Sequence, residues 1–167
     1  MFREMRRKNQ VLSSEECVQV LNRATSGVLA VSGDDDYPYA VPLSYVYHNN
    51  KIYFHGAKAG HKLDGIKRNE KVSFCVIDQD QVVQDEYTSY FRSVIVFGRA
   101  HVMEEEKKRE ALEILTARYS PDIEETERSQ AIDRGLMNVC MLELEIEYMS
   151  GKEAIELIKS KRKSTIE

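Results

Sequence analysis

The residues best suited to bind a ligand lie in a short stretch between Gly56 and Lys62, directly after an apolar run. Gly56 and Gly60 let the backbone turn sharply and approach a bound group closely. His61 and Lys62 follow at the point where a helix is expected to begin. Free N–H groups at a helix start, beside a lysine, are well suited to hold a phosphate. The same pattern is also typical of an ordinary turn between a strand and a helix.

Histidine and cysteine are the other residue types that could act in catalysis. His55 precedes the stretch, and because histidine titrates near neutral pH it could polarise a substrate or donate a proton. The alternative is a packing role at the end of a strand. Cys17, Cys75 and Cys140 are an odd number of cysteines without metal-ligand spacing. We expect reduced, buried thiols and predict no metal site.

A strand predicted over residues 39–48 has two unequal faces. One face is bulky and resembles a core face: it carries Tyr39, Val41, Leu43, Tyr45 and Tyr47. The other face begins with the small residues Ala40, Pro42 and Ser44. Pro42 cannot donate a hydrogen bond to a neighbouring strand. Such a face could accept a flat ring against its backbone, and the alternative is an edge strand or a bulge at Pro42.

The elements around these residues follow from hydrophobic periodicity and turn signals. Helices are predicted at residues 13–24, 61–68, 104–119, about 120–136 and about 151–162. Strands are predicted at residues 28–31, 39–48, 51–55, 71–78, 90–102 and 139–148, with a polar loop over residues 79–87. Hairpin connections dominate, so a mainly β fold with helices is expected, an antiparallel barrel with helices outside it.

Local signals mark several of the boundaries. Ser13 with Glu16, and Ser150 with Glu153, have the capping-box spacing that begins a helix. Gly98 lies in the middle of a strand and predicts a bulge or a close approach of other backbone. The alternating run over residues 139–148 places its glutamates toward water. Residues 1–167 are interpreted as one domain, with a basic N-terminal arm over residues 1–12.

Composition excludes several classes of function. The net charge is −4, and the basic clusters lie near the two ends of the sequence, so no nucleic-acid partner is expected. No apolar run is long enough to span a bilayer, and no apolar segment follows the basic N-terminus as a signal peptide requires. We therefore expect a cytoplasmic protein without a membrane partner.

Several stretches together are more specific than any one of them. They are residues 27–31, 37–47, 52–57, 60–62, 93–98 and 147–152. In combination they resemble the flavin-binding split-barrel proteins related to pyridoxamine 5′-phosphate oxidase, and most of all the 5-nitroimidazole-resistance (Nim) group. The arginine-rich signature with which the oxidases themselves bind substrate phosphate is absent late in the chain. Vitamin B6 oxidase activity is therefore not expected.

The resemblance implies a split barrel that forms a homodimer, with FMN bound at the subunit interface and FAD left open as the cofactor. It also implies the cofactor-binding residues. These are Pro42, Leu43, Ser44 and Tyr45 along the flavin ring, His55, Gly56 and Ala57 beside the ring and ribityl chain, Gly60, His61 and Lys62 at the phosphate, and Ser93 reaching the flavin from the partner subunit.

Two functions follow from this resemblance. The first is a flavin-dependent oxidoreductase that reduces a small aromatic substrate such as a 5-nitroimidazole, with His55 as the candidate catalytic residue. No dinucleotide-binding glycine motif is present, so NAD(P)H would be a transient electron donor. The second is a flavin-binding or flavin-sensing dimer without turnover. A haem-binding split barrel is the third alternative, but no histidine has motif support as an axial ligand.

Overall fold

Seven strands and five α-helices make up the part of the chain that the computed structural model describes, residues 1–164. The strands are β1 (Ser26–Ser32), β2 (Pro38–Ser44), β3 (Val46–His48), β4 (Lys51–Gly56), β5 (Lys71–Val83), β6 (Thr88–Val102) and β7 (Cys140–Glu153). The helices are α1 (Ser14–Arg23), α2 (His61–Arg68), α3 (Glu105–Tyr119), α4 (Glu125–Gly135) and α5 (Ile155–Ser164), with short 3₁₀ turns at η1 (Lys8–Gln10), η2 (Asp34–Asp36), η3 (Gln84–Glu86) and η4 (Leu136–Asn138).

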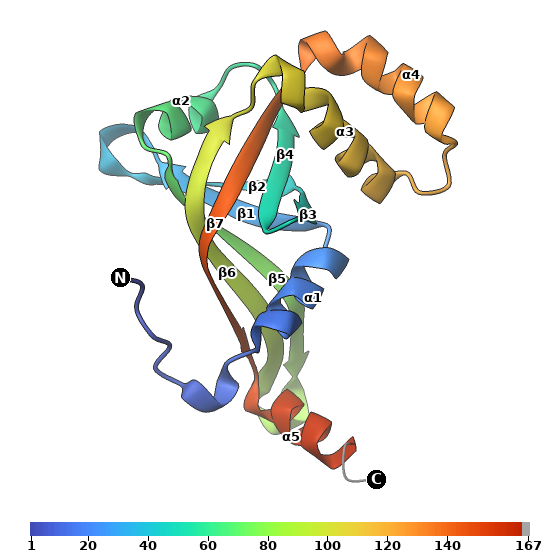
Figure 1. The fold of residues 1–167 in the computed structure, drawn as a ribbon. Helices are drawn as coiled ribbons and strands as arrows, with labels where there is room; N and C mark the ends of the chain where they lie inside the picture. The colour runs from blue at the N-terminus through green and yellow to red at the C-terminus, as the bar shows by residue number, and fades with distance from the viewer. Residues whose placement is uncertain (165–167) are drawn as a thin grey trace.

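The sheet has the order β2-β1-β5-β6-β7-β4-β3, and all of its pairs are antiparallel. It curls around a core, and the two end strands, β2 and β3, are not paired with each other although only Tyr45 separates them in the chain. The barrel is therefore split at this corner (Figure 1). The predicted antiparallel split barrel with peripheral helices is confirmed.

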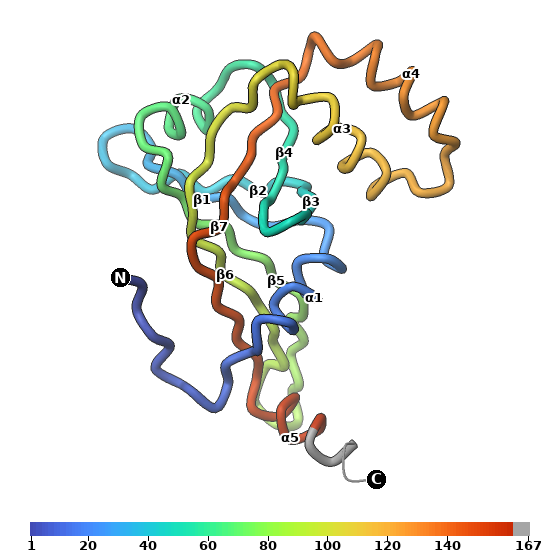
Figure 2. Tube along the Cα trace, in the orientation of Figure 1, coloured from blue at the N-terminus to red at the C-terminus, as the bar shows by residue number. Residues whose placement is uncertain are grey.

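The barrel encloses one apolar core. Alternate residues of each strand point inward, so Leu29, Phe54, Phe74, Val96 and Leu144 have no exposed surface. Helix α1 covers one opening of the barrel with an apolar stripe, and α2 covers another part with Leu63 and Ile66. The hairpin of α3 and α4 packs against the outer side of β3, β4 and β7. Figure 2 shows α2 at one end of the sheet and α5 at the other.

Several local predictions are confirmed. Ser13 and Glu16 make both hydrogen bonds of a capping box at the start of α1. The register of β6 against β7 shifts at Gly98, and a Cβ atom there would overlap the carbonyl oxygen of Glu145. Gly98 is thus required by a close backbone approach at the bulge.

In the described residues, no helix is long and apolar enough to cross a membrane.

Two predictions about β5 and β7 are wrong. Residues 79–83 were expected in a polar loop, but they extend β5 and pair with the start of β6. Backbone hydrogen bonds hold this ribbon, so its polar side chains do not prevent it from forming. Residues 150–153 were expected to begin the C-terminal helix, but they continue β7. Glu153 pairs with Arg92 at 2.9 Å instead of capping a helix, and α5 begins at Ile155.

Two more boundaries differ from the expectation. The strand predicted over residues 39–48 breaks at Tyr45 into β2 and β3, because Tyr45 turns into the core. Residues 120–124 form a turn and α4 begins only at Glu125. The guanidinium of Arg128 donates to the carbonyl groups of Ser120 and Ile123, so a side chain stabilises this turn where a first helical turn was expected.

Candidate functional site

The loop between β4 and α2 leaves the first N–H groups of the helix available. Gly60 precedes α2 with a φ of 135°, a conformation that L side chains rarely adopt. The N–H groups of Leu63 and Asp64 both donate to the Gly60 carbonyl oxygen, at 2.9 and 3.2 Å. The preceding N–H groups, of His61 and Lys62, have no intrahelical acceptor because of their position in the helix. They can therefore donate to an anion.

Lys62 lies against the end of β4. A Cβ atom built on Gly56 would be 3.0 Å from Nζ of Lys62 and 3.1 Å from its Cε, so the lysine occupies the space that a larger residue would need. Lys62 is half-buried, and no acidic side chain pairs with it among the described residues. A glycine, a lysine and a helix start therefore form a small cradle with an uncompensated positive charge, which fits a phosphate group.

His61 is turned toward the β1–β2 hairpin. Its ring stacks on Tyr39 with the centroids 4.1 Å apart, and its Nε2 lies 3.4 Å from Oδ2 of Asp34. Arg68, at the other end of α2, donates to Oδ1 of the same carboxylate at 2.9 Å. Asp34 thus joins both ends of α2 to the hairpin. No pattern in the sequence around Asp34 indicates this role.

The small face of β2 is open to solvent. The side chains of Ala40, Pro42 and Ser44 lie outside the barrel and are exposed. Leu43 packs inward against the core. Pro42 lies on an edge strand, where its missing N–H group breaks no ladder between two strands. β2 is thus the edge strand that was one of the two expectations for Pro42, and its small side chains leave room for a flat ring.

The face continues across the sheet in register. Pro42, Val28, Cys75, Ile95 and Ser150 lie side by side on β2, β1, β5, β6 and β7. Val28 and Ile95 are 36% and 39% exposed, and the neighbouring Ile77 is 62% exposed. These residues, which we call the outer face, form a broad surface of small and apolar side chains. The N-terminal arm lies against part of β7, where Phe2 stacks on Tyr148 and Val11 pairs with Lys152.

Tyr45 is part of the core. It is 1% exposed, its hydroxyl donates to the Leu21 carbonyl oxygen at 2.8 Å, and its ring contacts Phe74 edge-on. Its backbone N–H and carbonyl groups both bond to the hydroxyl of Tyr119, at 3.0 and 2.8 Å. Burial raises the pKa of this phenol strongly above its ordinary value. Tyr45 therefore positions the break between β2 and β3, and its side chain is not available to a ligand.

His55 and Ser93 lie apart from the lysine cradle. His55 is exposed, pairs with Met141 across the β4–β7 ladder, and points to the opposite side of β4 from Phe54 and Gly56. Ser93 is on the outer face of β6, beside Ile77. Because β1 and β5 separate β6 from β2, Ser93 and β2 are roughly 14 Å apart in one subunit. Ala57 and Gly60 lie in the loop that carries the cradle.

A second polar cluster lies on the α3 side of the sheet. Glu143 was expected to face water, but it is 7% exposed, and its Oε1 accepts from Lys51 at 2.8 Å and lies 3.3 Å from Nε2 of His101. The hydrogen bond to Glu143 raises the pKa of Lys51. A cavity of about 350 Å³ opens above these residues, bounded by α3 and the β3–β4 turn. The expectation was wrong because α3 covers this part of β7.

Known proteins share both the sequence pattern and the fold. A family model for pyridoxamine 5′-phosphate oxidase matches residues 13–153. An uncharacterized protein from Rhizobium meliloti is 33% identical over 90 residues; the match covers 54% of this chain and 54% of the relative, so it spans about half the length of that curated relative.

Two solved structures extend the comparison to the fold. One is a protein from Bacteroides thetaiotaomicron assigned to 5-nitroimidazole antibiotic resistance, with a TM-score of 0.71, 21% identity and 86% of each chain covered. The other is an FAD-binding protein from Mesorhizobium loti, with a TM-score of 0.59 and 27% identity over 87% of this chain and 97% of that one.

Proposed function

Because the chain belongs to the pyridoxamine 5′-phosphate oxidase family, we propose that it binds a flavin at the junction of β2, β4 and α2 and uses it as an oxidoreductase. The observation that carries this proposal is the position of Lys62. Its ammonium lies over Gly56 at the start of α2 and has no acidic partner among the described residues. A phosphate needs such a positive charge together with N–H donors.

The surroundings of Lys62 suit the other parts of a flavin. The loop residues Gly56, Ala57 and Gly60 leave room for the ribityl chain next to the cradle. The small exposed residues of β2, Pro42 and Ser44, offer a surface for the ring. A nitroaromatic substrate carries no phosphate, so the proposed function needs no arginine-rich pocket for one. The arginine-rich signature of the oxidases is indeed absent from the sequence. The FAD-binding protein from Mesorhizobium loti supports the assignment to flavin.

A homodimer is part of the proposal. The outer face exposes Val28, Ile77 and Ile95 on one continuous surface, and an apolar surface of this kind is typical of a protein interface. Two copies that pair through their outer faces would cover it. They would also bring Ser93 of the partner subunit toward β2, which Ser93 of the same subunit cannot reach because two strands separate them.

The proposed substrates are nitroaromatic compounds such as 5-nitroimidazoles, with NAD(P)H as a transient donor. The flavin would supply the electrons, and the protein would hold it and exclude water from it. His55, which is exposed and lies between Phe54 and Gly56 on β4, is the candidate proton donor. The fold shared with the Bacteroides thetaiotaomicron protein supports this choice of substrate class.

The test has two steps. Purified protein should take up FMN or FAD and become yellow, and Lys62→Ala should abolish the colour. Lys159→Ala, on α5 at the opposite end of the sheet, is the matched control and should stay yellow. The loaded protein is then reduced anaerobically with NADPH or NADH and mixed with a nitroimidazole. Reoxidation no faster than that of free flavin would reject turnover and leave the non-catalytic flavin-binding dimer as the function.

A further inference from the structure

The split corner of the barrel, at Tyr45, is held by a side chain from α3 and not by strand pairing. β2 ends at Ser44, β3 begins at Val46, and the two strands do not pair with each other in the sheet. Between them, the backbone N–H of Tyr45 donates to the hydroxyl of Tyr119 at 3.0 Å. The single proton of that hydroxyl is shared by two acceptors, the carbonyl oxygens of Tyr45, at 2.8 Å, and Thr25. One hydroxyl at the end of α3 therefore binds three backbone groups at the corner.

The same turn of α3 also caps α1. The last carbonyl groups of a helix have no partner within it and must find one elsewhere. Arg118 donates to the carbonyl oxygens of Asn22 and Arg23, at 2.7 and 3.0 Å. The carbonyl oxygen of Leu21 accepts from the hydroxyl of Tyr45 at 2.8 Å. The end of α1 thus depends on side chains from α3 and from the split corner.

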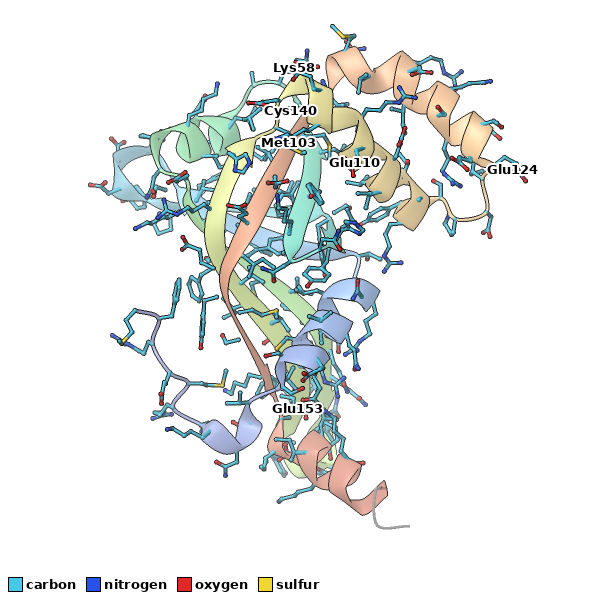
Figure 3. All side chains as sticks on the ribbon, in the orientation of Figure 1. Lys58, Met103, Glu110, Glu124, Cys140 and Glu153 are labelled. Carbon is cyan, nitrogen blue, oxygen red and sulfur yellow. The ribbon has the colours of Figure 1, made fainter. Side chains whose placement is uncertain are left out.

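The rest of α3 makes few apolar contacts with the protein. Its buried residues are Lys108, Ala111, Leu112 and Leu115. A cavity of about 350 Å³ lies between the helix and the sheet, another of about 300 Å³ lies between α3 and α4, and Ile114 borders both. Figure 3 shows Glu110 on α3 and Met103 just after β6, which both border the first cavity. A helix with a hollow on two sides has fewer dispersion contacts to oppose a shift.

The buried charges around α3 add little to its attachment. Lys108 is 1% exposed, and its ammonium donates to both carboxylate oxygens of Glu105 at 3.1 and 3.2 Å. Beneath the helix, Glu143 is 7% exposed and pairs with Lys51. Because removing charges from water costs about as much as their pairing returns, such pairs stabilise the docked helix weakly. To a large extent α3 is therefore held by its last turn, which also holds the corner.

We propose that α3 is a movable element that opens the split corner. In the closed state of the structure, Tyr119 holds Tyr45 and Arg118 caps α1. When α3 shifts into the space around it, these contacts break together and β2 is free to move relative to β3. β2 is the edge strand proposed for the flavin ring, so the shift would open and close that site. Only this consequence rests on the proposed function, and the motion itself does not.

Native-state hydrogen exchange, followed by NMR against urea concentration, tests the motion on protein without added flavin. The amide of Tyr45 should exchange through a local opening. It should exchange faster than the amide of Val96, which has no exposed surface, lies in a central strand and reports global unfolding. Tyr119→Phe keeps the ring but removes the hydroxyl, and it should speed the exchange of Tyr45 about tenfold. Tyr87→Phe, at a residue that is 98% exposed, is the control and should not change it.

Ile114→Ala tests whether α3 itself moves. It removes packing between the two cavities, more than one helical turn away from Tyr119. Removing an interaction speeds a local exchange only if the open state has already lost that interaction. Ile114→Ala should therefore speed the exchange of Tyr45 about fivefold. The matched truncation Ile66→Ala, at a buried residue of α2, should leave Tyr45 unchanged, although both variants lower the free energy of global unfolding.

Three outcomes would overturn the proposal. If Tyr119→Phe leaves the Tyr45 amide unchanged, the hydroxyl does not hold the corner. If Ile114→Ala leaves it unchanged, the corner opens without a shift of α3. If Tyr45 and Val96 in the unaltered protein exchange with the same opening free energy and the same urea dependence, the corner opens only in global unfolding. None of these measurements uses flavin, so failure of the flavin site would leave this test intact.

Discussion

The imidazole of His61 stacks on the ring of Tyr39, with centroids 4.1 Å apart and an angle of 29° between the planes. This contact joins the first residue of α2 to the edge strand β2, the two elements that the proposed flavin would touch. It also directs Nε2 of His61 toward Asp34 and away from the lysine cradle. His61 therefore positions α2 against β2 through its ring, and Lys62 provides the charge for the phosphate.

Asp34→Asn should strengthen flavin binding. The carboxylate of Asp34 holds His61 and Arg68 and opposes an incoming phosphate; the amide removes that charge but keeps the shape. We expect about threefold tighter binding at low salt and a smaller effect at high salt, because both groups are exposed and salt screens them. Flavin titrations at the two salt concentrations measure the effect.

Asp35→Asn is the control for this change, since Asp35 lies on the same 3₁₀ turn with a φ of 50° that asparagine tolerates. It should alter flavin affinity less than Asp34→Asn does. Equal effects of the two substitutions would mean that Asp34 acts only through the general charge of the hairpin.

Gly56→Ala should weaken flavin binding while leaving the fold intact. The added Cβ would meet only the flexible end of Lys62, at 3.0 Å from Nζ, so the lysine can move away at little cost to stability. Its ammonium would then leave the cradle, and we expect roughly a tenfold loss of affinity, the scale of one charge-assisted contact. Titration of the variant, with its melting temperature, checks both parts.

Gly135→Ala is the matched control, because a Cβ atom there meets nothing within 4 Å. It should leave flavin affinity unchanged. A large fall in the melting temperature of Gly56→Ala alone would show that the glycine serves packing and not the lysine.

Ile95→Lys should separate the proposed dimer. Ile95 is 39% exposed at the centre of the outer face, so a lysine can be accommodated in a single subunit but not between two apolar surfaces. Sedimentation velocity should show a folded monomer, and flavin binding should be lost with the partner. Met137→Lys, at a residue that is 69% exposed on η4, should remain dimeric. A dimer that survives Ile95→Lys would exclude the outer face as the interface.

Asp78→Asn should reduce the stability of the protein at neutral pH. Burial would raise the pKa of Asp78, but hydrogen bonds from Arg23 and Arg92 outweigh it and lower the pKa below its ordinary value. A carboxyl whose pKa is lower in the folded state stabilises the protein above its unfolded pKa of about 3.9, and this contribution is lost as the pH falls through the folded pKa.

We therefore expect Asp78→Asn to cost about 2 kcal/mol at pH 7, since it leaves Arg23 without a carboxylate partner and Arg92 with Glu153 alone. The variant should also lose less stability than the unaltered protein when the pH is lowered from 5 to 3. Urea unfolding across this range measures both effects. Asp80→Asn, at an exposed residue of the same strand, should unfold like the unaltered protein at every pH.

The sequence predicted the parts of this protein that depend on local patterns. The helix at residues 61–68 matches α2, and the unequal faces of the strand at Tyr39 are those of β2 and β3. Local patterns failed where a distant partner decides the structure. Residues 150–153 have capping-box spacing, but they pair with β6, and the Glu153 carboxylate forms an ion pair with Arg92 instead of capping a helix. Nothing near Glu143 in the sequence indicates that α3 would bury it.

In the candidate site, too, the sequence predicted the local features and missed the contacts between distant residues. The loop from Gly56 to Lys62 was recognisable from glycine spacing and a helix start. The roles of Tyr39 and Asp34 were not, because both lie more than twenty residues away from His61 in the chain and meet it only after β2 is placed beside α2. An acidic turn and a tyrosine in a strand have no pattern of their own that indicates a partner.

The position of β7 between β6 and β4 has a consequence for how the chain folds. Residues 51–56 of β4 pair with residues 140–145, about ninety positions later, and β3 is held in the sheet only through β4. During synthesis the β3–β4 hairpin therefore emerges long before the strand that receives it. Sheets closed by such distant contacts fold slowly, and unpaired strand edges invite association with other chains in the meantime. We infer that the lysine cradle at Gly56, which sits on this hairpin, is assembled late, after almost the whole barrel has been made.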